Sequence, residues 1–176
     1  MPRALTLHQR LRRIRLLACD VDGVLTDGGV YIMTEGEAKR FHVPDGLALR
    51  CWQLAGLKTA WISARPSAVT SRRAEELKTD FIEQTKDGKV PALRRILKQA
   101  KLDWHQVAFI GDDLVDLAVM KRVGLAVAPA NGCAEAKEIS HVTTEAGGGH
   151  GAVRELIEKI LKAQRKWDKV VKQVAR

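Results

Sequence analysis

The stretch LLACDVDGVLTDGG, residues 16–29, joins an apolar run to an acidic turn that contains glycine. The run at its start has the composition of a strand that is covered on both faces. Asp20 and Asp22 follow this run directly, and Gly23 comes next. The stretch therefore predicts a buried strand whose carboxyl end carries two carboxylates.

Further apolar runs follow along the chain, and amphipathic segments separate them. The predicted strands are LLACDV (16–21), KTAWIS (58–63), DFI (80–82), QVAFIG (106–111), LAVA (125–128) and HVTT (141–144). Helical periodicity covers residues 45–55, 67–77, 90–100, 114–121 and 132–139. Strands that alternate with helices are typical of a parallel sheet covered by helices. We expect an α/β fold, a three-layer Rossmann-like parallel sheet with helices on both faces.

Two segments depart from this alternation. Residues 28–43, GGVYIMTEGEAKRFHV, contain two extended pieces around a Thr-Glu-Gly-Glu turn, which predicts a small β-hairpin inserted after the first strand as a flap. Residues 151–174 have apolar side chains at helical spacing, which predicts one long amphipathic helix within a C-terminal tail, 145–176. With 176 residues, 45% of them hydrophobic, the chain is expected to form one domain over residues 1–176.

The net charge of +9 is concentrated at the two ends of the chain. Residues 1–15, with arginines from Arg3 to Arg15, and residues 162–176 each carry +5, whereas residues 16–161 carry −1. This distribution argues against a nucleic-acid partner. A nucleic-acid binder that uses the basic ends remains an alternative. No apolar stretch reaches the roughly 18 residues of a membrane span, and no cleavable signal is visible, so we expect a cytoplasmic protein with no membrane partner. The odd number of cysteines, Cys19, Cys51 and Cys133, fits a reducing compartment.

Polar side chains follow the predicted strands at their carboxyl ends, where open parallel sheets bind ligands. These candidates are Asp20, Asp22, Ser63, Arg65, Lys89, Asp112, Asp113 and Asp116. Carboxylates that converge on one mouth repel one another unless a cation neutralises them, and an all-oxygen set suits Mg²⁺. A serine hydroxyl, a lysine and the backbone N–H groups near Gly23 could hold phosphoryl oxygens. The pattern predicts metal-assisted phosphoryl chemistry.

Four of these motifs carry a family resemblance. DVDGVLTDGG, ISAR, Lys89 and GDDLVD, in this order at strand ends, resemble the motifs of the haloacid dehalogenase superfamily of phosphotransferases, over roughly residues 16–162. The hairpin, the FHVPDG segment and GGGHGAVREL resemble a capless branch of that superfamily, the 3-deoxy-D-manno-octulosonate 8-phosphate phosphatases. The chain departs from the branch at Ala48 and Ala64, where glycine is common, and in a loop one residue longer before Lys89.

The resemblance implies a role for each motif residue. Asp20 would be the nucleophile, and Asp22 the general acid and then the general base. Mg²⁺ would be held by Asp20, the backbone carbonyl of Asp22, and Asp112, with Asp113 outside this shell, where it would orient water or the lysine. Ser63 and Lys89 would stabilise charge on the transferring phosphoryl group.

Other positions remain open. Gly23, through the backbone, and Arg65 are candidate substrate-binding residues, while a surface ion pair is the alternative for Arg65. Lys86 competes with Lys89 for the role of the motif lysine, and Asp116 could cap a helix or bind metal. In the branch, the hairpin and the tail act across the subunits of a tetramer, so His150 and the glycine-rich segment are candidates for a neighbour's site.

The expected function is hydrolysis of a phosphorylated nonulosonic sugar acid by a Mg²⁺-dependent phosphatase. The favoured substrate is 3-deoxy-D-manno-octulosonate 8-phosphate, cleaved to 3-deoxy-D-manno-octulosonate and phosphate in lipopolysaccharide biosynthesis, by a homotetramer. The alternatives are another phosphosugar such as N-acylneuraminate 9-phosphate, or a non-catalytic phospho-accepting module of receiver type. The second carboxylate of the DxD pair disfavours the receiver, because hydrolysis needs an acid that phosphate storage does not.

Overall fold

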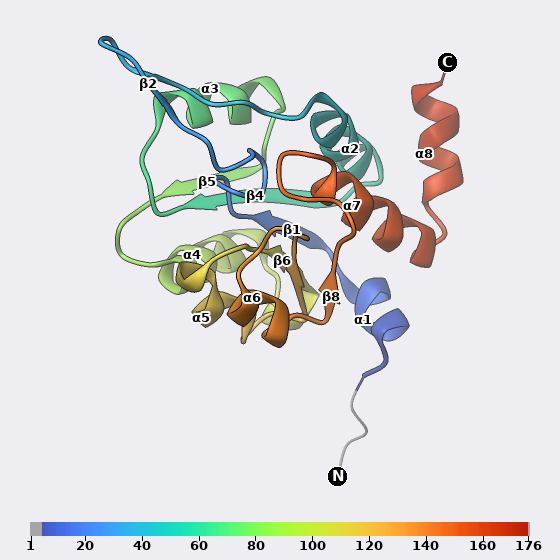
Figure 1. The fold of residues 1–176 in the computed structure, drawn as a ribbon. Coiled ribbons are helices and arrows are strands. Elements are labelled where there is room, and N and C mark those ends of the chain that lie inside the picture. Colours follow the sequence, from blue (N-terminus) through green and yellow to red (C-terminus); the bar gives the residue numbers. More distant parts are fainter. Residues whose placement is uncertain (1–4, 176) are drawn as a thin grey trace.

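The computed structural model describes residues 5–175 and contains a six-stranded parallel sheet in the order β5-β4-β1-β6-β7-β8 (Figure 1). The strands are β1 (Leu16–Cys19), β4 (Lys58–Ser63), β5 (Phe81–Gln84), β6 (Val107–Ile110), β7 (Leu125–Ala128) and β8 (Val142–Thr143). All five pairings are parallel. The six predicted strands are therefore confirmed, with ends that shift by at most two residues.

Helices cover both faces of the sheet, as predicted. The helices are α1 (Leu7–Arg13), α2 (Val43–Leu54), α3 (Ala68–Glu76), α4 (Lys89–Ala100), α5 (Leu117–Met120), α6 (Ala134–Ile139), α7 (Ala152–Ala163) and α8 (Trp167–Val174). In Figure 1, α2, α3 and α7 lie on one side of the sheet and α4, α5 and α6 on the other. Two short 3₁₀ turns are also present: Trp104–Gln106 precedes β6, and Leu114–Asp116 precedes α5.

The core consists of two apolar layers, one on each face of the sheet. Because side chains alternate along a strand, Leu17 and Cys19 of β1 enter the layer under α2 and α7, whereas Leu16 and Ala18 enter the layer under α4. All four residues of β1 are buried. A strand covered on both faces explains why the run had no polar alternation.

The predicted hairpin is present but its strands are short. β2 (Tyr31–Ile32) pairs antiparallel with β3 (Glu37–Ala38), and the hairpin projects beyond the sheet in Figure 1. Ile32 is 77% exposed, and Tyr31 and Met33 are exposed as well. The flap therefore presents apolar side chains that the rest of this chain does not cover.

The prediction of one long C-terminal helix is wrong, because the chain turns between α7 and α8. Arg165 adopts the left-handed conformation, with φ of 58°. The N–H of Arg165 donates to the carbonyl of Lys162, and the N–H of Lys166 donates to the carbonyl of Leu161. These two bonds form a Schellman motif, which ends α7 without a glycine.

The N-terminal segment forms a helix that the sequence reading did not predict. Thr6 and Gln9 make a reciprocal capping box at the start of α1. Gln164 donates to the carbonyls of Leu11 and Ile14, so the two basic ends of the chain meet beside α7. Arg3 and Arg176 lie outside the described residues. Within residues 5–175, no helix is long and apolar enough to cross a membrane.

Candidate active site

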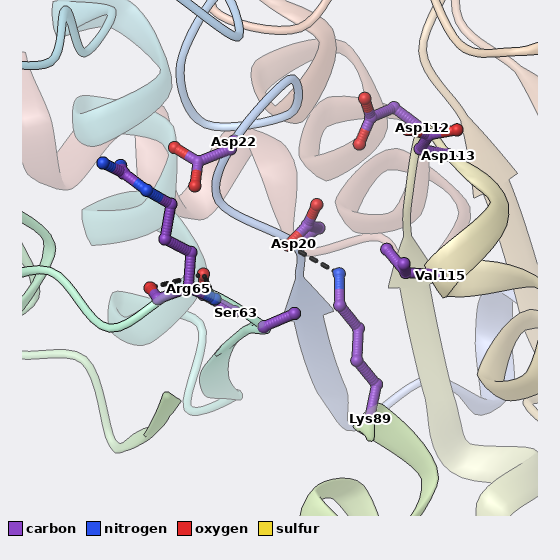
Figure 2. Close-up of a pocket in the computed structure, with 9 residues that line it drawn as sticks. Asp20, Asp22, Ser63, Arg65, Lys89, Asp112, Asp113 and Val115 are labelled. Carbon is purple, nitrogen blue, oxygen red and sulfur yellow. Dashed lines mark hydrogen bonds and ion pairs between the residues drawn. The ribbon is translucent and has the colours of Figure 1, made fainter. Parts of the chain in front are cut away.

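One pocket gathers the polar side chains that follow the strands, as Figure 2 shows. β1 lies between β4 and β6, so the segments after these three strands meet at one edge of the sheet. The loop after β5 brings the start of α4 to the same edge. The pocket is lined by Asp20, Asp22, Ser63, Ala64, Arg65, Lys89, Asp112, Asp113 and Val115.

Lys89 lies at the centre of this group. Its Nζ is 2.6 Å from Asp20 Oδ1 and 2.5 Å from Asp116 Oδ1, and its side chain is almost fully buried. Lys86, the competing candidate, is exposed in the loop before α4. The structure thus places Lys89, and not Lys86, beside the first aspartate.

Asp116 is fully buried and contacts residues that line the pocket. Its Oδ2 accepts hydrogen bonds from the N–H groups of Asp112 and Asp113, and its Oδ1 accepts one from Lys89. With both oxygens occupied, Asp116 orients the lysine and the loop after β6. This geometry matches the capping alternative for Asp116 better than the metal-ligand alternative.

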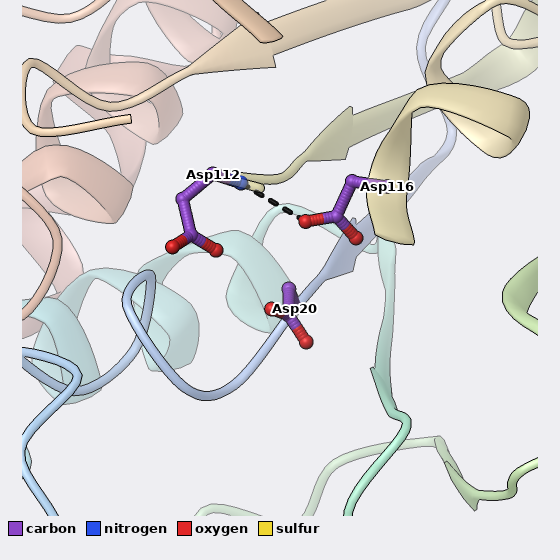
Figure 3. Close-up of side chains that lie close together, drawn as sticks. All are labelled: Asp20, Asp112 and Asp116. Atoms are coloured by element: carbon purple, nitrogen blue, oxygen red, sulfur yellow. Dashed lines mark hydrogen bonds between the residues drawn. The ribbon is translucent and has the colours of Figure 1, made fainter. Parts of the chain in front are cut away.

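Asp112 projects toward Asp20, as Figure 3 shows. Gly23 explains how these residues approach, because a Cβ built at Gly23 would lie 2.1 Å from Asp112 Oδ2, and its φ of +90° also favours glycine. Asp112 Oδ1 is buried without a hydrogen-bond partner. One oxygen of Asp112 is therefore available to a ligand that the protein itself does not supply.

Burial and mutual repulsion raise the pKa of both carboxyls. Burial is the largest cause for Asp20, whose pKa rises to about 6 although Lys89 opposes the shift. The pKa of Asp112 rises to about 8, through burial and then through the charges of Asp20 and Asp116. Burial lowers the pKa of Lys89, but the two carboxylates raise it more, so the lysine stays charged. The pocket holds more negative charge than one lysine can neutralise.

The carboxylates fit a small divalent cation. Asp20, Asp112 and Asp116 each offer an oxygen within 4.8 Å of the others. An unpartnered buried oxygen on Asp112 and the raised pKa values of Asp20 and Asp112 both indicate that charge neutralisation is incomplete. Carboxylate oxygens with room for water are the ligands that Mg²⁺ prefers. Asp20 and Asp112 are the side chains best placed to hold such an ion.

Ser63 and Arg65 follow β4 and form another wall of the pocket. Ser63 Oγ accepts a hydrogen bond from the N–H of Arg65 at 3.0 Å and lies 3.0 Å from its carbonyl. The Arg65 guanidinium forms an ion pair with Glu37 of the hairpin, while its Nη1 is buried with no hydrogen-bond partner within residues 5–175. Arg65 thus forms the protein ion pair considered for it and also lines the pocket, as the substrate-binding alternative requires.

Asp22 pairs with a lysine that the sequence pattern did not single out. Lys39, just after β3, places its Nζ 2.8 Å from Asp22 Oδ1. The contact has the distance of an ion pair without the alignment of a hydrogen bond. The available signal was the alternation in Glu-Ala-Lys (37–39), which puts Glu37 and Lys39 on the same side of the hairpin strand.

Two further candidates make contacts that differ from the expected ones. Asp113 is exposed at the pocket, and its Oδ1 accepts a hydrogen bond from the N–H of Leu114, so Asp116, rather than Asp113, contacts the lysine. Gly23 does not line the pocket, and its N–H faces Thr26 Oγ1 at 3.4 Å. The requirement for glycine at this position is steric.

The glycine-rich segment packs on its own chain. A Cβ at Gly148 would lie 1.7 Å from the carbonyl oxygen of Gly23, and one at Gly149 would lie 2.3 Å from the nitrogen of Asp27. His150 Nε2 lies 2.8 Å from Arg40, which also pairs with Asp27. Gly148 and Gly149 therefore pack closely on the turn after β1 of their own subunit, and the expected role of this segment in a neighbour's site stays a prediction.

Asp45 holds this segment in place. It is buried in the first turn of α2 and accepts hydrogen bonds from the N–H groups of Gly151 and Arg154 at the start of α7. A carboxylate at a helix N-terminus also interacts favourably with the helix dipole. The FHVPDG motif thus connects α2 to the loop that covers the turn after β1.

The fold and the residues at the strand ends define a class of hydrolases. Residues 67–156 match the haloacid dehalogenase-like hydrolase family. Over 159 residues the chain is 41% identical to the 3-deoxy-D-manno-octulosonate 8-phosphate phosphatase KdsC of Yersinia pestis, covering 90% of this chain and 85% of that protein. The chain belongs to this phosphatase family within the haloacid dehalogenase-like hydrolases.

Solved structures agree with this assignment. The 3-deoxy-D-manno-octulosonate 8-phosphate phosphatase of Moraxella catarrhalis, in complex with magnesium, phosphate and the sugar acid, superposes with a TM-score of 0.91 at 40% identity, covering 95% of this chain and 97% of that chain. The cobalt-bound enzyme of Haemophilus influenzae superposes with a TM-score of 0.87 at 38% identity, covering 90% of this chain and 93% of that one. The α/β fold with its inserted hairpin is confirmed.

Proposed function

We propose that this chain is a Mg²⁺-dependent phosphatase that hydrolyses 3-deoxy-D-manno-octulosonate 8-phosphate to 3-deoxy-D-manno-octulosonate and phosphate. The observation that carries the proposal is the pocket in which Asp20, Lys89 and Asp112 meet, in a fold shared at 40% identity with an enzyme that binds magnesium, phosphate and the sugar acid. We place the enzyme in the cytoplasm and in lipopolysaccharide biosynthesis.

In the first step, a carboxylate oxygen of Asp20 attacks the phosphorus, and the bond from phosphorus to the sugar oxygen breaks. Lys89, held by Asp20 and Asp116, and the hydroxyl of Ser63 stabilise the negative charge on the transferring phosphoryl group. Asp22 gives its proton to the leaving sugar oxygen. The products of this step are the free sugar acid and a phosphorylated Asp20.

In the second step, the Asp22 carboxylate takes a proton from a water molecule that attacks the phosphorus, and the bond from phosphorus to Asp20 breaks. Mg²⁺, held by Asp20, Asp112 and the carbonyl of Asp22, would neutralise the carboxylates and the phosphoryl charge when bound. Asp113, which is exposed and lines the pocket, would orient a water molecule there. Inorganic phosphate and the original carboxylate of Asp20 result.

Specificity for the sugar acid is assigned to Arg65, which lines the pocket and whose Nη1 has no hydrogen-bond partner among residues 5–175. A guanidinium suits a carboxylate-bearing sugar, because it presents several donors in a fixed geometry. We also propose a homotetramer. Exposed Tyr31, Ile32 and Met33 on the hairpin support association of this flap with neighbouring subunits.

The test is phosphate release from a panel of eight- and nine-carbon sugar acid phosphates and smaller sugar phosphates, with Mg²⁺ and with EDTA. We expect the highest kcat/KM on the eight-carbon substrate and no turnover in EDTA. Asp20→Asn should be inactive, whereas Asp87→Asn, a change at an exposed loop carboxylate, should match the parent. A preference for N-acylneuraminate 9-phosphate or a small phosphosugar would overturn the substrate assignment, and turnover by Asp20→Asn would overturn the mechanism. Equilibrium sedimentation tests for four chains.

A further inference from the structure

Lys39 is a buried lysine that contacts Asp22, one of the residues that line the pocket. Its side chain has no exposed area, whereas that of Asp22 is 26% exposed. Its Nζ lies 2.8 Å from Asp22 Oδ1 and donates a hydrogen bond to Thr70 Oγ1 at 3.2 Å. An ammonium group is costly to bury unless it is paired, so these two contacts fix where the lysine ends.

Three separate segments meet at this lysine. Lys39 lies at the end of the hairpin, Asp22 lies in the turn after β1, and Thr70 lies in the first turn of α3. The lysine therefore connects the flap to the acidic turn through a charge and to α3 through a hydrogen bond. Glu37, two residues earlier, forms an ion pair with Arg65. One strand of the flap therefore contacts two pocket residues, Asp22 and Arg65.

Lys39 restrains the Asp22 carboxylate through charge attraction and not through an aligned hydrogen bond. Asp22 Oδ1 has no aligned hydrogen bond, and Lys39 is its one ion-pair partner among residues 5–175. Proton transfer requires the carboxylate to lie within roughly 2.6–3.2 Å of the reacting oxygen, and a misplacement of about 1 Å can cost on the order of 100-fold in rate. Lys39 is therefore the charged group that restrains the Asp22 carboxylate near that position.

We propose that Lys39 is a positioning residue for Asp22 and makes the placement of the acid–base group depend on the hairpin. The inference rests on the proposed function, because it presupposes that Asp22 moves the protons. Lys39 itself forms no bond with the substrate and takes part in no proton transfer. The flap then contributes to the rate of the reaction, in addition to any role in substrate recognition.

A double-mutant cycle tests this. Lys39→Met keeps the length of the side chain and removes the charge, and Asp22→Asn removes the group that it positions. We expect Lys39→Met to lower kcat by about 10- to 100-fold with KM changed by less than about threefold. In the Asp22→Asn background, Lys39→Met should cause little further loss. Lys86→Met, at an exposed position, should leave kcat unchanged.

The outcomes separate the two proposals. If Lys39→Met slows the parent and the Asp22→Asn enzyme by the same factor, or leaves kcat of the parent unchanged, the lysine acts independently of Asp22 and the inference is overturned. If Asp22→Asn turns over as fast as the parent, the acid–base assignment itself fails. Thr70→Val covers the case in which Lys39→Met does not fold. It removes one contact of Lys39, and a smaller kcat loss that vanishes with Asp22→Asn supports the inference, whereas an equal loss in both backgrounds overturns it.

Discussion

The Nζ of Lys89 lies 2.6 Å from Asp20 Oδ1, and Asp116, in the short turn after β6, contacts the same ammonium through its Oδ1. The lysine therefore has a fixed position before any substrate binds. A preorganised cation costs no rearrangement when negative charge develops on the transferring phosphoryl group.

Removal of this cation should affect both the rate and the stability. We expect Lys89→Met to lower kcat by about 100- to 1,000-fold, by analogy with the loss of one preorganised donor. The variant also leaves Asp20 and Asp116 without their ion pair, so the free energy of unfolding should fall by about 3–5 kcal/mol. The two effects are separated by measuring kcat at a temperature at which circular dichroism shows that the variant is folded.

Lys86→Met is the matched control, because Lys86 is exposed and lies in the same loop. It should leave both kcat and the melting temperature close to those of the parent. A large loss of activity in Lys86→Met, with little change in Lys89→Met, would reverse the assignment of the motif lysine.

The two raised carboxyl pKa values predict how stability depends on pH without metal. The pKa values of Asp20, about 6, and Asp112, about 8, lie above the value near 4 expected in the unfolded chain. The folded state therefore binds protons more tightly, and the stability that this provides is lost as the pH rises from about 4 through about 8. The melting temperature in EDTA should fall across this window.

Mg²⁺ should reverse that loss, because it occupies the site only when the carboxylates are deprotonated. We expect the rise in melting temperature caused by saturating Mg²⁺ to be larger at pH 9 than at pH 5, by roughly 5 °C or more. Asp112→Asn should abolish most of this difference. A Mg²⁺ effect of the same size at both pH values would contradict the assigned ligands.

The strands and the residues at their ends could be predicted from the sequence because both depend on local pattern. A strand such as β1, buried on both faces, must be apolar throughout, and the polar residues after it necessarily face the edge of the sheet. The break between α7 and α8 could not be predicted in this way. Apolar spacing continues through Arg165, and only its left-handed backbone, in a non-glycine residue, ends the helix.

The contacts that position the candidate site were also beyond the sequence, because they join segments far apart in the chain. Asp116 appeared as a cap or a ligand, and its bond to Lys89 shows how it can orient the site. Lys39 received no role from the sequence, because its buried contact with Asp22 depends on how the base of the hairpin packs against the turn after β1 and against α3. Periodicity identifies the face of a strand and not the partner that this face meets.

The unpartnered donor of Arg65 predicts a selective effect on substrate binding. Arg65→Ala should raise KM for the sugar acid phosphate by about 10- to 100-fold, because a charged hydrogen bond contributes about 1.5–3 kcal/mol. Turnover of an aryl phosphate without a carboxylate should change much less. Arg72→Ala is the control, since Arg72 is exposed on α3. Equal losses on both substrates would show that Arg65 acts on the phosphoryl group or on the fold.

The close packing of the glycine-rich segment on the turn after β1 predicts that Gly148 tolerates no side chain. A Cβ at Gly148 would lie 1.7 Å from the carbonyl oxygen of Gly23, so Gly148→Ala must displace the backbone next to Asp22. We expect a loss of about 1–3 kcal/mol in the free energy of unfolding, as for other overpacked sites, together with a lower kcat.

Gly147→Ala provides the comparison for this substitution. Its Cβ would meet the side chain of Asn131 at 3.2 Å, a contact that a shift of this side chain by a few tenths of an ångström relieves, so the variant should lose less stability and keep its rate. Chemical denaturation and steady-state kinetics of both variants measure the difference. If Gly148→Ala unfolds at the same denaturant concentration as Gly147→Ala, the segment does not pack on its own chain in solution. An extended segment that reaches a neighbouring subunit would then be the better description of this part of the protein.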